Sequence, residues 1–157
     1  MRRGSRGGVA LTPASEAGLL EGVTRAFLFD VGRDVGVEVR DETLYPQDLD
    51  AADEVFITSK LNNGFHRPDD ARKAFDSTLA ALKMDYIDLF LIHWPLPTLY
   101  DGDYVSTWKA LEEFQRDGRA RSIGVSNFQV AHLERLAAEA DVVPAVNQIE
   151  AHPYFTN

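Results

Sequence analysis

Two residues with chemically useful side chains stand at the ends of predicted strands. His93 follows the apolar run 87–92 and precedes Trp94 and Pro95. Lys60 closes a second compact predicted strand, residues 55–60. Near-continuous apolar runs are typical of parallel strands buried on both faces. Because α/β folds place their chemistry at the carboxyl ends of such strands, His93 and Lys60 are the first candidate site residues.

The elements that must position these residues alternate between strand and helix from residue 54 onward. Strands are expected near 55–60, 87–94, 122–126 and 144–150, and helices near 68–82, 103–117 and 129–138. This order predicts an α/β fold with a parallel sheet and right-handed crossovers. Alternation along the second strand places Leu89, Leu91 and His93 on one face.

The N-terminal third carries no recognisable motif. Residues 1–18 are rich in Gly, Ser and Arg, which predicts disorder. In residues 19–53, Ala26–Phe29 and the alternating valines at 35, 37 and 39 suggest two short strands. The glycines here do not form a dinucleotide-binding fingerprint.

Composition excludes several functional classes. The 157 residues suffice for one domain with a real core, and the net charge of −9 argues against nucleic acid and anionic membranes as partners. The absence of cysteine excludes disulfides, a thiolate nucleophile and a cysteine metal site. The composition fits a cytoplasmic protein, no apolar stretch is long enough to span a bilayer, and the basic start of the chain lacks the apolar core of a secretory signal.

Each predicted strand ends in a distinctive phrase. In order these are Ile57-Thr58-Ser59-Lys60-Leu61, Leu91-Ile92-His93-Trp94-Pro95, Ile123-Gly124-Val125-Ser126-Asn127-Phe128, and Asn147-Gln148-Ile149-Glu150 followed by His152-Pro153. Over about residues 54–157, the series closely resembles the aldo-keto reductases, most strongly bacterial members similar to 2,5-diketo-gluconate reductases.

The resemblance implies a (β/α)₈ TIM-type barrel that reduces a small aldehyde or ketone with NADPH. Residues 54–157 would be a partial barrel of about four βα units, and residues 1–53 a poorly matching segment. Carried over by position, Lys60 and His93 resemble catalytic residues, Trp94 a substrate-pocket aromatic, and Ser126, Asn127 and Gln148 the residues that hydrogen-bond the nicotinamide carboxamide. The oligomeric state stays open.

The residue types suit those roles. Hydride arriving at a carbonyl carbon leaves negative charge on oxygen, which needs a pre-placed donor or acid. His93 can donate to that oxygen, and Lys60 supplies positive charge that would lower the pKa of a neighbouring phenol. A carboxamide presents one acceptor and two donors, which hydroxyl and amide side chains can satisfy.

The sequence also departs from the family's pattern. The family's proton-donor tyrosine lies in an Asp-Thr-Ala-x-x-Tyr phrase that is absent here, and Tyr45, the only tyrosine before Lys60, has different surroundings. The last barrel strands, with the nicotinamide-stacking aromatic and the 2′-phosphate ligands, have no counterpart. We therefore expect a truncated gene product with strongly reduced activity. Residues 1–53 would come from a shifted reading frame, a hypothesis that translating the DNA in all three frames tests.

Each candidate also has a structural alternative. Ser126 or Asn127 could cap the helix beginning near Gln129, with Ser126 and Gln129 forming a capping box. Trp94 could be core packing, and Gln148 an ordinary buried amide. His66, His132 and His152 lack metal-ligand spacing and are expected in loops or on the surface. The alternative function is a non-catalytic reductase-like fragment or interaction module with weak nucleotide binding.

Overall fold

The structure, a computed structural model, describes residues 9–13, 23–42 and 55–150. The chain divides into two compact units, which are described separately. The first comprises Met1–Val55 and Glu150–Asn157, and the second comprises Phe56–Ile149.

The first unit contains a strand, a helix and a strand. β1 (Val9–Pro13) pairs in parallel with β2 (Glu38–Glu42), and α1 (Val23–Val35) lies between them in sequence. Two predictions are wrong here: β1 falls in the segment expected to be disordered, and the expected strand Ala26–Phe29 belongs to α1. A short apolar run does not distinguish strand from helix by itself, and valine or phenylalanine at every fourth position from Val23 to Val35 extends the helical pattern.

The second unit confirms the predicted alternation. Its main elements are β3 (Thr58–Leu61), α2 (Pro68–Leu82), β4 (Ile87–Ile92), α3 (Tyr104–Arg116), β5 (Ala120–Ser126), α4 (Val130–Glu139) and β6 (Asn147–Gln148), with short 3-10 helices η3 (Asn63–Phe65) and η4 (Tyr100–Gly102). The four strands form one parallel sheet in the order β3-β4-β5-β6. β6 has only two residues and is much shorter than the predicted 144–150.

Local signals set the helix boundaries. Pro68 opens α2, with Asp69 and Asp70 in its first turn, where acidic side chains interact favourably with the helix dipole. Asp103 caps α3 by accepting a hydrogen bond from the Ser106 N–H at 3.0 Å. Gly118 follows α3 with φ +76°, a conformation that glycine adopts readily. These signals fix where each crossover returns to the sheet.

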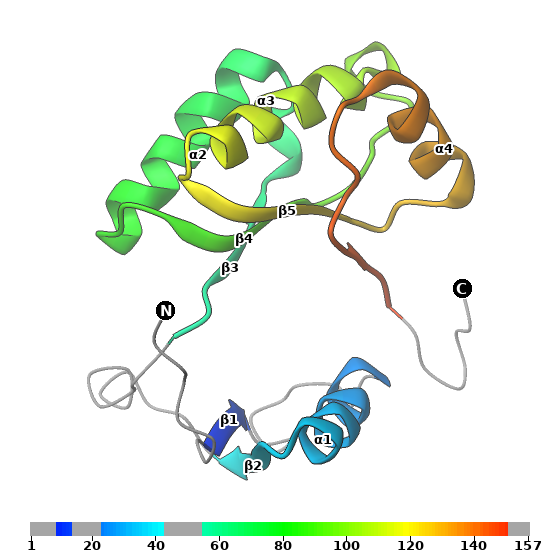
Figure 1. The fold of residues 1–157 in the computed structure, drawn as a ribbon. Helices are drawn as coiled ribbons and strands as arrows, with labels where there is room; N and C mark the ends of the chain where they lie inside the picture. Colours follow the sequence, from blue (N-terminus) through cyan, green and yellow to red (C-terminus); the bar gives the residue numbers. More distant parts are fainter. Residues whose placement is uncertain (1–8, 14–22, 43–54, 151–157) are drawn as a thin grey trace. The chain divides into compact units, whose positions relative to one another are not determined.

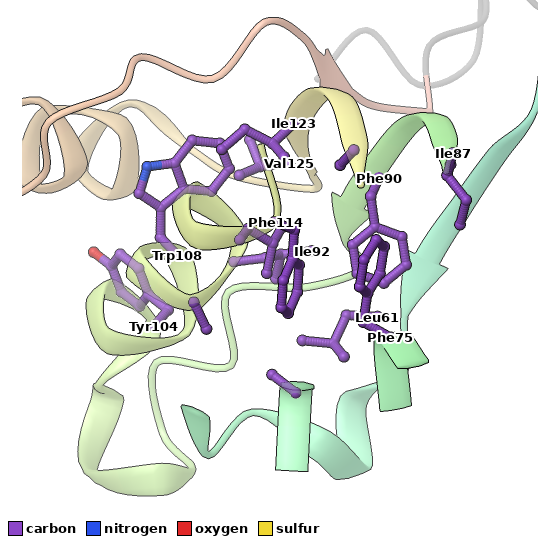
Figure 2. Packing of buried hydrophobic residues seen from close by; sticks show 14 of the residues in the cluster. Leu61, Phe75, Ile87, Phe90, Ile92, Tyr104, Trp108, Phe114, Ile123 and Val125 are labelled. Carbon is purple, nitrogen blue, oxygen red and sulfur yellow. The ribbon is translucent and has the colours of Figure 1, made fainter. Parts of the chain in front are cut away.

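A hydrophobic core lies between the sheet and helices α2 and α3, which cover the same side of it (Figure 1). Figure 2 shows Phe90, Ile92 and Val125 from the strands packing toward helix residues. The rings of Phe75 and Phe114 stack at 4.1 Å, joining α2 to α3. Burial of such large aromatic side chains dominates the energetics of a core this size.

Two buried carboxylates tie loops to this core. Asp88 accepts hydrogen bonds from the Ile57 N–H at 2.9 Å and from Arg121 at 2.9 Å. Glu112 accepts from the N–H groups of Asp141 and Val142 at 3.0 and 2.9 Å. Each charge is hydrogen-bonded, as a buried carboxylate requires.

Candidate active site

All six predicted site residues lie at or just past the carboxyl ends of four adjacent parallel strands. The strand bounds give their positions. Lys60 is the second-last residue of β3, and His93 and Trp94 directly follow β4. Ser126 ends β5 with Asn127 after it, and Gln148 ends β6. Parallel strands bring these ends to the same edge of the sheet.

The strand register also sorts these residues by face. Leu61, Ile92 and Val125 are registered neighbours and belong to the helix-covered core. One position earlier, Lys60, Leu91 and Gly124 form the neighbouring row, which alternation assigns to the opposite face. We call this opposite face the inner face of the sheet.

The other polar candidates continue the inner face toward the strand ends. His93 lies two residues beyond Leu91, and Ser126 lies two residues beyond Gly124. Ser126 is in register with Gln148. The sheet therefore assigns an ammonium, an imidazole, a hydroxyl and an amide to one face and one edge.

Asn127 joins three of the strand ends. Its side-chain Nδ2 donates to the His93 carbonyl at 2.9 Å, and its backbone N–H donates to the Gln148 carbonyl at 3.0 Å. Its φ of 61° is left-handed, a conformation that asparagine tolerates better than most residues. Asn127 thus fixes the spacing between His93 and the end of β6.

Ser126 has a buried side chain with an unused hydroxyl. The residue is 1% exposed, and Oγ has no hydrogen-bond partner. The predicted capping role for Ser126 and Asn127 is wrong, because Gln129 is the N-cap of α4 and forms its capping box with His132. A buried hydroxyl left unpaired is rare and is the kind of atom that a bound polar group would satisfy.

The remaining candidates are accessible. Trp94 is 46% exposed, so the core-packing alternative is wrong. Gln148 is exposed rather than a buried amide, Lys60 is exposed, and His93 is half-buried. These four side chains are therefore within reach of a diffusing substrate or cofactor.

A cavity of about 530 Å³ lies beside β3 and α2. Lys60 lines it, but none of the other five predicted site residues does. Among the described strands, β3 has a neighbour on one side only, so its outer edge leaves a groove against α2. We place the candidate site where the polar groups converge, on the inner face, rather than in this groove.

His66 was expected in a loop or on the surface; it lies in the loop after η3, where it is buried. It is 2% exposed, its ring stacks on Tyr100 at 5.4 Å, and Nε2 has no hydrogen-bond partner. Burial lowers the pKa of its imidazole. The sequence signal was weak, because a loop position by itself does not reveal which neighbouring loop will cover it. His152 lies outside the described residues.

Two further kinds of feature are lacking in the described residues. There, no group of three His, Asp or Glu side chains has an arrangement that could hold a metal ion. Within the same residues, no helix is both long and apolar enough to cross a bilayer.

Four successive parallel strands, with a helix after each of β3, β4 and β5 and polar groups at the strand ends, define a partial (β/α) barrel. The model of the aldo/keto reductase family matches residues 41–157, an onset earlier than the residue 54 indicated by the strand-end phrases. The chain belongs to the aldo/keto reductase family. A second model, amino-transferase class IV, matches residues 5–64, which is less than half of the chain.

Relatives and solved structures agree with this assignment. Glyoxal reductase of Bacillus subtilis (strain 168) is 48% identical over 106 residues, covering 68% of this chain and 37% of the relative. An aldo/keto reductase from Brucella melitensis is 38% identical, with a TM-score of 0.62 over 98% of this chain and 51% of that one.

A Bombyx mori aldo-keto reductase in complex with NADP is 30% identical, with a TM-score of 0.57 over 93% of this chain and 44% of that one. The chain spans about a third to a half of the length of the curated relatives it matches.

Proposed function

We propose that this chain is part of an NADPH-dependent reductase that transfers a hydride to a small aldehyde or ketone. The observation that carries the proposal is the convergence of Lys60, His93, Ser126 and Gln148 on one face and one edge of a parallel sheet, with Asn127 linking the strand ends. The reductase relatives support the reaction class. We place the protein in the cytoplasm, in line with its composition.

The residues present fit a nicotinamide carboxamide. The Ser126 hydroxyl is buried without a partner, and Gln148 presents an exposed amide on the same registered pair. Together with Asn127 they offer the donors and acceptors that a carboxamide needs. NADPH supplies the hydride when bound, and these side chains would hold its ring in register with the substrate carbonyl.

His93 and Lys60 would handle the charge that develops on the substrate oxygen. His93 is half-buried at the end of β4, where it can donate a hydrogen bond to that oxygen. Lys60, one strand away on the same face, adds positive charge that favours the anionic form. Because the sequence lacks the family's Asp-Thr-Ala-x-x-Tyr phrase, we propose that this chain works orders of magnitude more slowly than a complete site would.

The proposal predicts separable effects on binding and turnover. NADPH fluorescence titration should show saturable binding, and oxidation of NADPH with methylglyoxal should show slow turnover. Lys60→Met and His93→Ala should each lower turnover at least about 100-fold, the usual scale for loss of a general acid or charge stabiliser, with NADPH affinity nearly unchanged. Lys109→Met, an exposed lysine on α3, is the matched control. Wild-type turnover in both site variants would refute the assignment.

The missing tyrosine phrase favours one second candidate, a non-catalytic module that binds nucleotide weakly. It predicts saturable NADPH binding that Ser126→Ala weakens, with no turnover of any reactive aldehyde. Measurable turnover that disappears in Lys60→Met would exclude this candidate.

A further inference from the structure

The loops that follow β3 and β4 are joined by one side chain. The Tyr100 hydroxyl donates a hydrogen bond to the Asn63 carbonyl at 3.0 Å. The ring of the same tyrosine stacks on the His66 ring, with 5.4 Å between centroids and 14° between planes. Asn63 and His66 belong to the loop directly after the Lys60 strand, whereas Tyr100 belongs to the loop that begins with His93.

The loop that carries Tyr100 adopts a strained backbone. Tyr100, Asp101 and Gly102 have consecutive positive φ values of 52°, 58° and 68°, and Leu96 has φ 47°. A left-handed residue other than glycine costs about 1 kcal/mol or more, so surrounding contacts must hold it. One such contact is the hydrogen bond from Arg135 to the Gly102 carbonyl at 2.8 Å.

His66 provides the packing surface on which the Tyr100 ring stacks. Its carbonyl accepts a hydrogen bond from the buried Thr107 hydroxyl at 2.6 Å, which anchors it to α3. Its ring is buried and Nε2 makes no hydrogen bond, so the ring contributes a flat packing surface rather than a polar contact. In the same loop, the Asn62 side chain caps η3 by accepting a hydrogen bond from the Gly64 N–H at 2.9 Å.

We propose that Tyr100 is a positioning residue that locks the Lys60 loop against the His93 loop. This inference rests on the proposed function. Among the described strands, β3 pairs only with β4, and the printed register ends at Leu61. Beyond that point, the hydrogen bond and the ring contact of Tyr100 link the segment after Lys60 to the segment after His93.

This arrangement predicts a split between catalysis and cofactor binding. The candidate carboxamide ligands lie on β5 and β6, on the far side of β4 from the Tyr100 contacts. Loosening the Lys60 loop therefore misplaces charge at the reacting carbonyl without disturbing the nicotinamide contacts. Small misplacements of a catalytic group cost large factors in rate.

The test combines amide hydrogen exchange with kinetics on the full chain. Tyr100→Ala should speed exchange of the Gly64 and Phe65 amides at least tenfold. It should also lower kcat for methylglyoxal at least tenfold and change the NADPH dissociation constant less than threefold. Tyr100→Phe keeps the stacked ring and loses the hydrogen bond to Asn63, so it should retain about a fivefold effect on both quantities and lie between wild type and Tyr100→Ala. Tyr86→Ala, a half-buried tyrosine before β4, is the control for loss of a ring.

Each contrary result has a distinct meaning. Unchanged exchange at Gly64 and Phe65 in Tyr100→Ala would overturn the lock itself. Faster exchange with unchanged kcat would overturn the positioning role while leaving the proposed function intact. If Tyr100→Ala exchanged faster but the wild-type chain showed no turnover, the proposed function would have failed, and the positioning role would fail with it. Equal losses in kcat and NADPH affinity, matched by Tyr86→Ala, would reduce Tyr100 to a purely structural residue.

Discussion

At the scale of single residues, Ser126 should matter for cofactor binding but not for the stability of the fold. Its hydroxyl is buried and unpaired in the folded chain, an unfavourable arrangement that a ligand would relieve. Ser126→Ala should therefore leave the free energy of unfolding unchanged or raise it slightly. The same change should weaken NADPH binding by about 1 kcal/mol, roughly fivefold, for one lost hydrogen bond. Urea unfolding and fluorescence titration measure the two effects.

The opposite pattern would contradict this view of Ser126. If Ser126→Ala destabilised the chain and left NADPH affinity intact, the hydroxyl would have a structural partner instead of a cofactor. Ser126→Thr, which keeps the hydroxyl but adds a methyl group, is the companion variant. It should keep part of the affinity if its extra methyl group fits.

His66 should make stability depend on pH. Burial holds the pKa of the folded imidazole below its ordinary value of 6.5, so the unfolded chain takes up the proton first as the pH falls. This contribution is complete above pH 6.5 and is lost as the pH falls from 6.5 toward the folded pKa, with a slope of at most about 1.4 kcal/mol per pH unit. Urea unfolding between pH 7.5 and 5.5 measures it.

The matched variant for that measurement is His66→Phe, which keeps a flat ring against Tyr100 and cannot be protonated. The slope of unfolding free energy between pH 7.5 and 5.5 should be shallower in this variant. Equal slopes in the two proteins would show that another group carries the pH dependence.

At the scale of elements, the inner face is packed closely enough to require glycine at one point. A Cβ on Gly124 would lie 2.8 Å from the Val146 carbonyl oxygen and 2.7 Å from a Leu91 methyl carbon. The carbonyl belongs to backbone adjoining β6 and has little freedom to move. Gly124→Ala should therefore destabilise the chain by about 1–3 kcal/mol, the usual cost of overpacking, as measured by urea unfolding.

Gly64→Ala is the control, because its added Cβ would meet only the Asn62 side chain at an ordinary 3.5 Å. It should change stability by no more than about 0.5 kcal/mol. If the two variants were equally stable, β5 and β6 would have to separate more easily than their register suggests.

The same elements show what the sequence could reveal. Proline at the start of α2, glycine after α3 and the apolar run of β4 are local signals, and each was sufficient to predict its element. β4 is buried along most of its length, as its near-continuous apolar run predicted. β6 was overestimated because a strand ends where its neighbour stops pairing, and its ladder holds only two registered pairs with β5. The first unit was misjudged because its apolar runs are too short to establish a period.

The candidate site could be predicted from the sequence because its residues stand at or just past the carboxyl end of each strand. Lys60, His93 and Gln148 could be proposed without any contact being known. The link between Tyr100 and His66 could not, because it depends on how two irregular loops pack and on positive φ values that their residue types do not demand. Capping was also misassigned, since Ser126 and Gln129 are both able to cap and only the backbone geometry chooses between them.

At the scale of the whole molecule, stability should be unequal between the two units. Every member of the large buried cluster lies between Leu61 and Leu136, inside the second unit. β4 and β5 are the strands with neighbours on both sides among the described residues, whereas β3 and β6 are at the edges. In the first unit, Gly32 is the one residue classed as buried among those whose exposure is described. Local unfolding is easiest where buried apolar contacts are few.

Hydrogen exchange of the full chain should therefore resolve three levels of protection. Amides of Ile87–Ile92 and Ala120–Ser126 should exchange slowest, those of the edge strand Thr58–Leu61 faster, and those of Glu38–Glu42 fastest. The difference between the first and last groups should be at least about tenfold, because opening of the first unit leaves the large core intact. Peptide-level exchange followed by mass spectrometry measures it. Uniform protection across both units would mean that the chain unfolds as one cooperative body and would contradict this prediction.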